Sequence, residues 1–377
     1  MRISAVVVLS LLALLAVGLA PTELGACTGF FIGGQDGRLM AFSYDWPVAG
    51  GRVLVNPNGL VKTALVGEGL APATWTARFG SVTFNQYGRE FPNGGMNRAG
   101  LAMHALWLAG TSYPKFDGPA IEALQWVQYC LDSYKTVGEV AESARTMAIS
   151  SPASLHFFAC DAAGSCAVIE FLDGAPVVRA GDELPLPVLT NSTYAGSIAA
   201  LDRSLGYGGA LAPGDQDESL QRFVQTASRL NTIRVGDPDM PLERAFAMLA
   251  EVGTSDENQW RIAYDLRAKV VHFTVRGKAE RGKLSLTALD FACREGAIRT
   301  LDLAGPFAGD AVAALKPYRP EDNLALVRAT IARTEFLQPF PEERLLGIAN
   351  YPNGLQCAAP PQPAASGTPG PRPFPVD

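Results

Sequence analysis

The chain has 377 residues, of which 48% are hydrophobic and 18% are charged, an ordinary balance for a globular protein. Its net charge is −6, with no basic block and no run of aromatic residues among lysines, which argues against nucleic-acid binding. The length allows one large domain or two small ones with a sizeable core.

The first 26 residues have the layout of a secretory signal peptide. Arg2 supplies an early positive charge, residues 5–20 form an almost unbroken apolar run, and a short polar stretch ends in the small residue Ala26. The apolar run is short for a membrane span, and no later run reaches that length. We therefore expect an exported protein, periplasmic or extracellular, whose mature chain starts at Cys27.

A cysteine at the start of a chain carries a thiol nucleophile and a free α-amine on one residue. The amine has an unperturbed pKa of about 7.7–8.0, so it accepts a proton near neutral pH and can act as the base for its own thiol. Leu24-Gly25-Ala26-Cys27 also resembles a bacterial lipobox, in which the thiol carries a lipid and the amine is acylated. From these residues alone, catalysis, lipid anchoring and a purely structural cysteine all stay open.

The first mature segment predicts a β-hairpin. One strand covers residues 27–32, a glycine-rich turn covers 33–37, and the return strand covers 39–44. Further strands are expected at 52–56, 60–66, 81–84 and 101–108.

The pattern then changes to the spacing of one helix face, in Ile121, Leu124, Val127 and Leu131. Thr136 and Glu139 form a capping-box pattern that opens the next helix. After two strands around a Cys160/Cys166 turn, we expect a strand at 188–191, helices at 218–230 and 242–252, strands at 260–265 and 270–275, and a helix near 323–336. This order predicts an α+β domain over residues 27–350, with helices layered on antiparallel sheets. The proline-rich tail 358–377 is expected to be disordered or extended.

Six cysteines in an exported protein suggest disulfides. Cys160 and Cys166 flank a turn between two apolar strands and are placed to bridge, whereas Cys293 and Cys357 are a second pair by elimination. Cys130 lies on the apolar stripe of a helix, as a buried free thiol would. None of these spacings indicates a metal site, and neither a metal nor a cofactor is expected. The three histidines lie in strand-like apolar runs and are expected in the core: His104, His156 and His272.

Several separated segments match one family pattern, in order along the chain. Cys27-Thr28-Gly29-Phe30 and Ser43-Tyr44-Asp45-Trp46 resemble the opening of choloylglycine hydrolases and penicillin V acylases, which are N-terminal nucleophile amidases. Later stretches that resemble the family's motifs lie at residues 95–101, 188–192, 213–215, 221–224, 259–260 and 264–266. The resemblance favours the catalytic role of Cys27. It implies a four-layer αββα N-terminal nucleophile hydrolase sandwich, with two antiparallel sheets between helical layers.

The resemblance also implies roles for five residues. Cys27 Sγ attacks an amide carbonyl while its α-amine handles the proton, and Asp45, at the end of the hairpin's second strand, holds the ammonium form. The Asn191 side chain and the Trp107 backbone N–H donate to the oxyanion. Arg222 places a positive charge near the thiol, which lowers its pKa. The Trp107 ring is either plain core or a wall for an apolar acyl group.

The chain departs from the family at Phe42, three residues before Asp45, where many members carry arginine. An apolar ring beside the nucleophile is expected to favour an apolar or aromatic acyl group over an anionic one. Trp107 replaces the asparagine of many bile-salt-cleaving members and the tyrosine of many that prefer penicillin V. It is similar to Gram-negative acylases that also cleave acyl-homoserine lactones.

The expected reaction is hydrolysis of a linear, non-peptide amide through a thioester on Cys27, as in penicillin V acylases or acyl-homoserine lactone acylases. A bile salt hydrolase is one alternative, and a lipid-anchored, catalytically inactive binding protein of the same fold is another. The expected partner is a small-molecule amide with an apolar or aromatic acyl group. Members of the family often form homotetramers, so a homo-oligomer is also expected.

Overall fold

The computed structural model describes residues 25–33, 38–115, 117–212, 214–232, 241–253 and 258–359. The expected signal peptide up to residue 24 and the proline-rich tail from residue 360 lie outside the described residues, as does Pro213 of the family-like motif.

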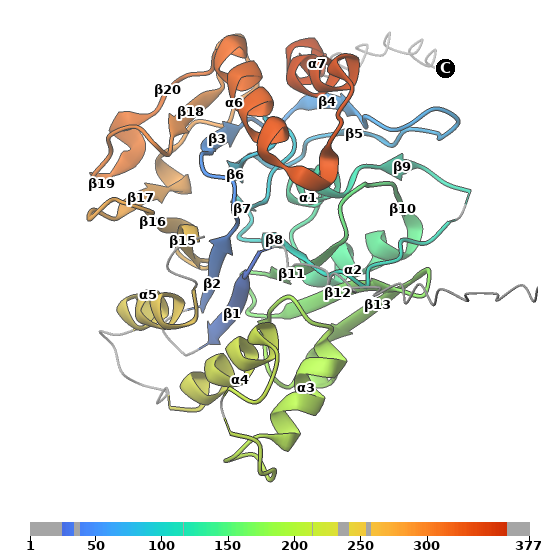
Figure 1. The fold of residues 1–377 in the computed structure, drawn as a ribbon. Helices are drawn as coiled ribbons and strands as arrows, with labels where there is room; N and C mark the ends of the chain where they lie inside the picture. The colour runs from blue at the N-terminus through green and yellow to red at the C-terminus, as the bar shows by residue number, and fades with distance from the viewer. Residues whose placement is uncertain are drawn as a thin grey trace, which may run out of the picture.

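Two large sheets carry the fold (Figure 1). The seven-stranded sheet has the order β14 (Val188–Leu189), β1 (Thr28–Gly33), β2 (Arg38–Asp45), β15 (Asn258–Asp265), β16 (Val270–Val275), β17 (Gly282–Ser285) and β19 (Gly309–Asp310). The nine-stranded sheet has the order β13 (Ala175–Ala180), β12 (Cys166–Leu172), β11 (Leu155–Cys160), β8 (Ala102–Trp107), β7 (Gly94–Asn97), β6 (Ser81–Asn85), β3 (Arg52–Asn56), β18 (Arg299–Asp302) and β20 (Lys316–Pro317). Neighbouring strands are antiparallel throughout, apart from the parallel pair β17 and β19.

Two small sheets complete the strands. One pairs β9 (Ala120–Ile121) with β10 (Ala148–Ile149), and the other joins β21 (Gln356–Cys357), β4 (Leu60–Thr63) and β5 (Thr74–Thr76). The α-helices are α1 (Ala123–Ser133), α2 (Val137–Thr146), α3 (Tyr194–Arg203), α4 (Glu218–Asn231), α5 (Pro241–Val252), α6 (Pro320–Arg333) and α7 (Glu342–Asn350). Short 3₁₀ helices lie at Gly181–Glu183, Leu286–Ala288, Ala311–Ala314, Glu335–Leu337 and Tyr351–Gly354.

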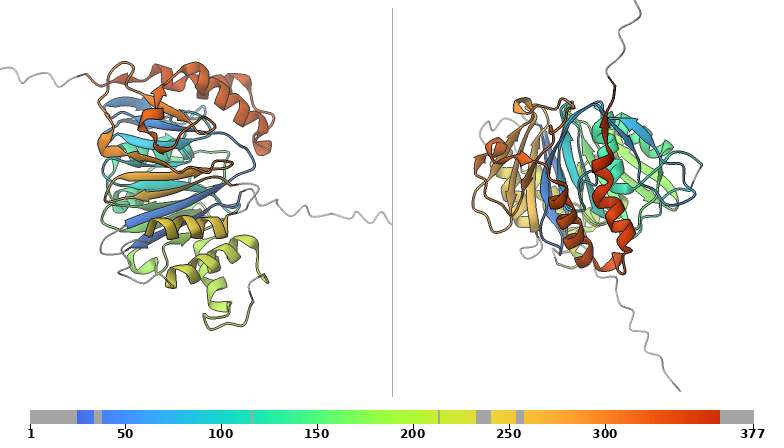
Figure 2. Two further views of the ribbon diagram at one scale, coloured as in Figure 1. Left: turned by 90° about the vertical axis from the view of Figure 1, so that its left-hand side faces the viewer. Right: turned by 90° about the horizontal axis from the view of Figure 1, so that it is seen from above.

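The layers follow the order that the sequence predicts. Helices α4 and α5 pack on the seven-stranded sheet, and α1 and α2 pack on the nine-stranded sheet. The view from above in Figure 2 shows the sheets side by side, with α6 and α7 lying across one end of them. The expected four-layer α+β sandwich is confirmed.

The β1–β2 hairpin sorts its side chains between two faces. Thr28 is paired with Ser43, and Gly29 with Phe42, so each pair shares one face of the sheet. A Cβ built on Gly29 would lie 3.0 Å from the ring of Phe158 in β11, which places the Gly29–Phe42 face toward the nine-stranded sheet. Thr28 and Ser43 therefore face α4 and α5, where polar partners are available.

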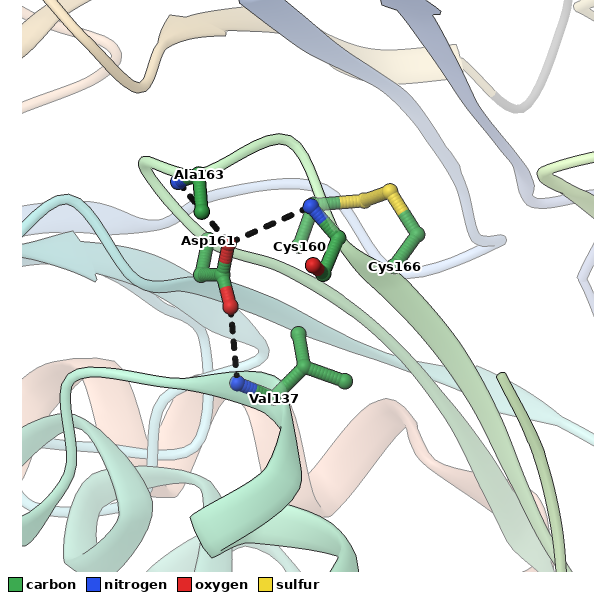
Figure 3. Close-up of a disulfide and its surroundings, with 6 residues drawn as sticks. Val137, Cys160, Asp161, Ala163 and Cys166 are labelled. Atoms are coloured by element: carbon green, nitrogen blue, oxygen red, sulfur yellow. Dashed lines mark hydrogen bonds between the residues drawn. A yellow bond between two sulfur atoms is a disulfide. The ribbon is translucent and has the colours of Figure 1, made fainter. Parts of the chain in front are cut away.

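The predicted capping box and cysteine hairpin are both present. Thr136 accepts from the Glu139 N–H and Glu139 returns a carboxylate to the Thr136 N–H, which starts α2. Cys160 and Cys166 form a disulfide across the β11–β12 hairpin (Figure 3). Asp161 in the turn accepts from the N–H of Val137, the first residue of α2 (Figure 3). The Asp161 carboxylate therefore links the β11–β12 turn to α2, the helix that covers these strands.

The end of the described chain forms a separate lobe, made of the helical pair α6–α7. Val327, Ile331, Leu345 and Ala349 form its buried core. The chain then reaches β21, which pairs with β4 and carries the Cys293–Cys357 disulfide. The expected second disulfide is thus present, and Cys130 is a buried free thiol, as expected. No helix was expected at the position of α7.

A cluster of four buried charges lies under α1, between β4 and the loop after β6. Lys62 forms ion pairs with Glu90 and, at 2.8 Å, with Asp132. Arg89 pairs with the other oxygen of Glu90 at 3.1 Å and donates to the Pro352 carbonyl. We call Lys62, Arg89, Glu90 and Asp132 the buried ion cluster; it joins α1, the sheet and the segment after α7.

No helix in the described part of the chain is long and apolar enough to cross a membrane.

Candidate active site

Cys27 lies directly before β1 and lines a cavity of about 110 Å³. Only 2% of the residue is exposed, so the thiol is reached through the cavity and not from the outer surface. The walls are mostly aromatic and come from both sheets and from the α6–α7 lobe; among them are Tyr44, Trp46, Tyr87, Phe91, Trp107, Phe336 and Phe340. This shape and lining are typical of a site for an apolar small molecule.

The residues before Cys27 are packed against β2. Gly25 adopts a φ of 84°, and a Cβ there would lie 2.8 Å from the Asp45 carbonyl oxygen, so only glycine lets the chain pass this close. Ala26 is buried and its N–H donates to that same carbonyl at 3.1 Å. With Ala26 attached, the nitrogen of Cys27 is an amide and cannot act as a base.

The thiol of Cys27 is held in its neutral form in this unprocessed chain. Burial raises its pKa to about 12, and the negative charge of Asp45 adds to the rise. Arg222 acts in the opposite direction, as the sequence predicts, but it does not outweigh burial. Arg222 thus lowers the thiol pKa in the expected direction, while burial keeps the pKa high as long as Ala26 is attached.

Asp45 ends β2 and is fully buried. One carboxylate oxygen accepts from Ser43 Oγ at 2.7 Å, and the other accepts from Asn258 Nδ2 at 2.8 Å. Burial raises the pKa of Asp45 from 3.8 to about 6, against the lowering effect of these two donors and of the more distant Arg222 and Arg261. The structure thus surrounds a buried carboxylate with neutral donors.

Arg222, in the second turn of α4, ties the site together. Its Nη1 donates to the Cys27 carbonyl at 2.6 Å and to Thr28 Oγ1 at 2.9 Å, and its Nη2 donates to Asn191 Oδ1 at 3.0 Å. Arg222 is buried, and these bonds hold its guanidinium against the backbone of Cys27, the residue that carries the thiol. Arg222 is therefore not a solvent-exposed arginine on the surface of a helix, which is a common role for this residue type.

Asn191 and Trp107 meet across the two sheets. Asn191 follows β14, and its Nδ2 donates to the backbone carbonyl of Trp107, at the end of β8, at 2.9 Å. The N–H and C=O of one residue in an extended strand point the same way, so the Trp107 N–H also faces the Asn191 side. Asn191 and the backbone of Trp107 are thereby brought together, and Trp107 and Cys27 line the same cavity.

Phe42 lies elsewhere than the sequence suggests. Its ring is fully buried between the sheets and stacks on His104, with centroids 3.8 Å apart. It does not contribute to the cavity wall. The expectation that Phe42 shapes the acyl pocket is wrong, because the β1–β2 register turns its side chain into the packed layer between the sheets.

Two further polar residues were assigned differently by sequence reasoning. Asn258, which holds both Asp45 and Ser43, was missed, although it stands directly before the family-like Gln259-Trp260 pair. Asn97, in the family-like stretch 95–101, is structural: it donates to the carbonyls of Leu131 and Tyr134 and accepts from two N–H groups of its own turn.

Comparisons with known proteins agree with this geometry. No family model matches the chain. It is 26% identical over 363 residues to a penicillin V acylase of Pectobacterium atrosepticum, covering 82% of this chain and 95% of that protein. Its fold is similar to penicillin V acylase from Agrobacterium tumefaciens, with a TM-score of 0.68, 27% identity, and coverage of 78% of this chain and 98% of that one.

A variant of conjugated bile acid hydrolase from Clostridium perfringens shares the fold, with a TM-score of 0.59 and 20% identity, over 73% of this chain and 96% of that one. These likenesses span nearly the full length of each relative. The ordered motifs from Cys27 to Leu266, the paired antiparallel sheets and these relatives lead to one conclusion. In sequence and fold the chain is similar to penicillin V acylases, which supports its resemblance to the family of choloylglycine hydrolases and penicillin V acylases.

Proposed function

We propose that this protein is an exported cysteine amidase that hydrolyses the C–N bond of a linear, non-peptide amide through a thioester on Cys27. One observation carries the proposal: Cys27 lines an aromatic cavity, its thiol donates to the Asp45 carbonyl at 3.7 Å, and Arg222 links the Cys27 carbonyl to Asn191. Cleavage after Ala26 turns the Cys27 amide into an amine and supplies the base that the unprocessed chain lacks.

The chemistry follows from the atoms at this place. The α-amine takes the thiol proton, and Sγ attacks the substrate carbonyl carbon. The resulting oxyanion accepts from the Asn191 amide and the Trp107 N–H. As the C–N bond breaks, the α-ammonium returns the proton to the leaving amine. A water molecule then attacks the thioester, again losing a proton to the α-amine, and releases the acid and the thiol.

Asp45 has a role that depends on cleavage. Burial of its carboxylate favours the protonated form, against the two neutral donors that favour the ionised one. A new ammonium group at Cys27 supplies a nearby opposite charge, which favours the ionised carboxylate and the charged amine together. Asp45 therefore orients the amine and keeps its proton available for the leaving group.

The substrate class follows from the cavity and the relatives. Two of the relatives are named penicillin V acylases, and the aromatic lining suits a phenoxyacetyl or fatty-acyl group. We therefore expect cleavage of penicillin V or acyl-homoserine lactones in preference to conjugated bile salts.

The lipid-anchored alternative conflicts with the position of Cys27. A lipid on a sulfur atom that is 2% exposed would have to fill the cavity or pull Cys27 out of it. The intact mass of the mature N-terminus separates the two functions: a free cysteine at residue 27 supports the amidase, and the added mass of diacylglycerol contradicts it.

The test is a substrate panel on the processed protein. Penicillin V, glycine- and taurine-conjugated bile salts and acyl-homoserine lactones are compared by release of the free amine, with Cys27→Ala as the blank. Turnover that is lost in Cys27→Ala supports the amidase. Turnover that survives this change places the nucleophile elsewhere, and preferential cleavage of bile salts overturns the substrate class.

A further inference from the structure

The turn that carries Asn191 joins β14 to α3, and α4 holds it from one side. Arg222 donates to Asn191 Oδ1 at 3.0 Å. Ser219 accepts from Ser192 Oγ at 2.8 Å and donates to Thr190 Oγ1 at 3.1 Å. These contacts tie the turn to α4, which packs on the seven-stranded sheet. They leave the distance between the turn and the nine-stranded sheet to other contacts.

Two hydrogen bonds hold the turn against the nine-stranded sheet. Asn191 Nδ2 donates to the Trp107 carbonyl at 2.9 Å, and the backbone N–H of Tyr194 donates to Glu170 Oε1 in β12, also at 2.9 Å. Tyr194 is the first residue of α3, and its hydroxyl donates to the Leu186 carbonyl at 3.0 Å, so it closes the segment that contains β14 and Asn191. Glu170 therefore fixes the end of that segment.

Glu170 is fully buried, and its remaining contacts do not account for its position. Its Oε2 has no hydrogen-bond partner among the residues that the structure describes. His156 Nδ1 lies 3.5 Å from Oε1, which is too far for a strong hydrogen bond. Nor does α3 depend on Glu170 for a cap, because Thr193 Oγ1 accepts from the Gly196 N–H at 3.2 Å.

A buried carboxyl group costs free energy, and an apolar side chain of similar size would fill the same space without that cost. The contact that sets Glu170 apart is its bond to the Tyr194 N–H, which links the Asn191 turn to the nine-stranded sheet. This bond is only three residues away from Asn191 along the chain. Its effect is therefore expected at the Asn191 side chain.

We propose that Glu170 is a positioning residue for turnover: by holding the Tyr194 N–H, it sets the place of the Asn191 side chain relative to Trp107. The inference rests on the proposed function, in which Asn191 donates to the oxyanion. Glu170 acts through Asn191 and does not touch the substrate. A displacement of about 1 Å at a reacting centre can cost about 100-fold in rate, so release of the turn lowers kcat.

The experiment measures the processed protein on whichever amide of the substrate panel it cleaves fastest. Glu170→Met keeps the volume of the side chain but removes the acceptor, so kcat should fall by about tenfold to 100-fold, with KM within about twofold of the wild type. Glu170→Gln keeps an oxygen acceptor at the same place and should restore kcat to within about threefold.

The matched control is Asp161→Ala. Asp161 is also a buried carboxylate of the nine-stranded sheet that accepts from the first N–H of a helix, that of Val137 in α2, but it lies outside the cavity wall. This variant should lose stability and keep both kcat and KM. An unchanged kcat in Glu170→Met, or a loss that Glu170→Gln does not restore, would overturn the proposal.

A double variant shows whether Glu170 acts through Asn191. Glu170→Met added to Asn191→Ala should change kcat by less than about twofold, because the donor that Glu170 positions is already absent. If Glu170→Met lowers kcat by the same factor in both backgrounds, the two residues act independently and the proposal fails.

Hydrogen exchange tests the turn without turnover. Glu170→Met should speed exchange of the Tyr194 amide by about tenfold or more, whereas Glu170→Gln and Asp161→Ala should leave it unchanged. If the processed wild type cleaves none of the amides, the proposed function fails, while faster exchange at Tyr194 still supports the hold of Glu170 on the turn. Unchanged exchange at Tyr194 in Glu170→Met overturns that hold.

Discussion

Two groups of buried charges differ in how they are neutralised. In the buried ion cluster, Lys62 has two carboxylate partners and Arg89 pairs with one of them, so opposite charges meet directly. Beside Cys27, Asp45 is held by the neutral donors Ser43 and Asn258. No cation lies within 4 Å of it in the described parts of the chain.

This difference separates charges that stabilise the fold from a charge that is available for chemistry. A buried ion pair that is complete resists change, because removing one partner leaves the other charge buried and uncompensated. A buried carboxylate without a cation is poised to receive one, and removal of Ala26 creates a cation at Cys27. We therefore expect substitutions in the buried ion cluster to reduce stability, and substitutions around Asp45 to reduce turnover.

The largest expected effect is on turnover at Cys27. Cys27→Ser keeps the size of the side chain but replaces an ionisable thiol, so turnover should fall by about 10⁴-fold or more with an unchanged melting temperature. Cys130→Ser is the matched control, since Cys130 is also a buried free thiol but lies in α1, away from the cavity wall. It should retain turnover. Normal turnover in Cys27→Ser would end the assignment of the nucleophile.

Next in size is a loss of stability at Lys62. Lys62→Met leaves Glu90 and Asp132 facing each other without their shared cation, which should cost about 3–5 kcal/mol of unfolding free energy. Urea titration measures this, with the exposed Lys316→Met as the control, expected within about 0.5 kcal/mol of the wild type. The folded fraction of Lys62→Met should keep its kcat. If kcat falls while the unfolding free energy is unchanged, the buried ion cluster does not stabilise the fold as we expect.

Asn191→Ala and Asn97→Ala compare two asparagines that we expect to have different roles, one in turnover and one in stability. The loss of one oxyanion donor should lower kcat by about 100- to 1,000-fold, with a smaller change in KM. Asn97→Ala removes a buried asparagine that serves only its own turn and the end of α1, so it should reduce stability and spare kcat. A change confined to KM in Asn191→Ala would make Asn191 a substrate contact.

The smallest effect is a pH dependence of the unprocessed chain. The pKa of Asp45 rises from 3.8 to about 6 on folding, so the folded state keeps a proton that the unfolded chain loses above about pH 4. The stabilisation is therefore fully present below pH 4 and is lost as the pH rises toward and through 6, by about 3 kcal/mol.

Asp45→Asn provides the comparison, since it cannot titrate and should lack this part of the slope. In the processed protein the new ammonium lowers the pKa of Asp45, so the slope should diminish there too. Urea melts between pH 4 and 7 measure all three proteins. Parallel curves for the unprocessed wild type and Asp45→Asn would show that Asp45 does not titrate in this range.

The parts of the fold that depend on local pattern were predictable. Strand alternation and a glycine-rich turn predicted the β1–β2 hairpin, and Thr136 with Glu139 predicted the start of α2, because each signal lies within a few residues. Ordered motifs identified Cys27, Asp45, Trp107, Asn191 and Arg222 as candidates, and the structure brings these five together.

What was missed depends on contacts between distant segments. Asn258 reaches Asp45 across 213 positions of sequence, and nothing near Asn258 indicates that partner. The sequence showed that Phe42 stands where many relatives carry a charged residue. It did not show whether the Phe42 side chain faces the cavity or the layer between the sheets. Helix α7 has too few apolar residues to stand out, yet it supplies one wall of the cavity.

The Cys293–Cys357 disulfide makes the cavity dependent on the redox conditions of its surroundings. The bond spans 64 positions and, through loop closure, stabilises the fold by about 4 kcal/mol. The segment it encloses includes α6 and α7, which form the outer wall above Cys27. A chain that remains in a reducing compartment lacks this tether and holds this wall of the cavity by packing and by hydrogen bonds such as the β21–β4 pairing. If the chain is exported as we propose, oxidation of this disulfide and removal of the residues before Cys27 both take place outside the cytoplasm.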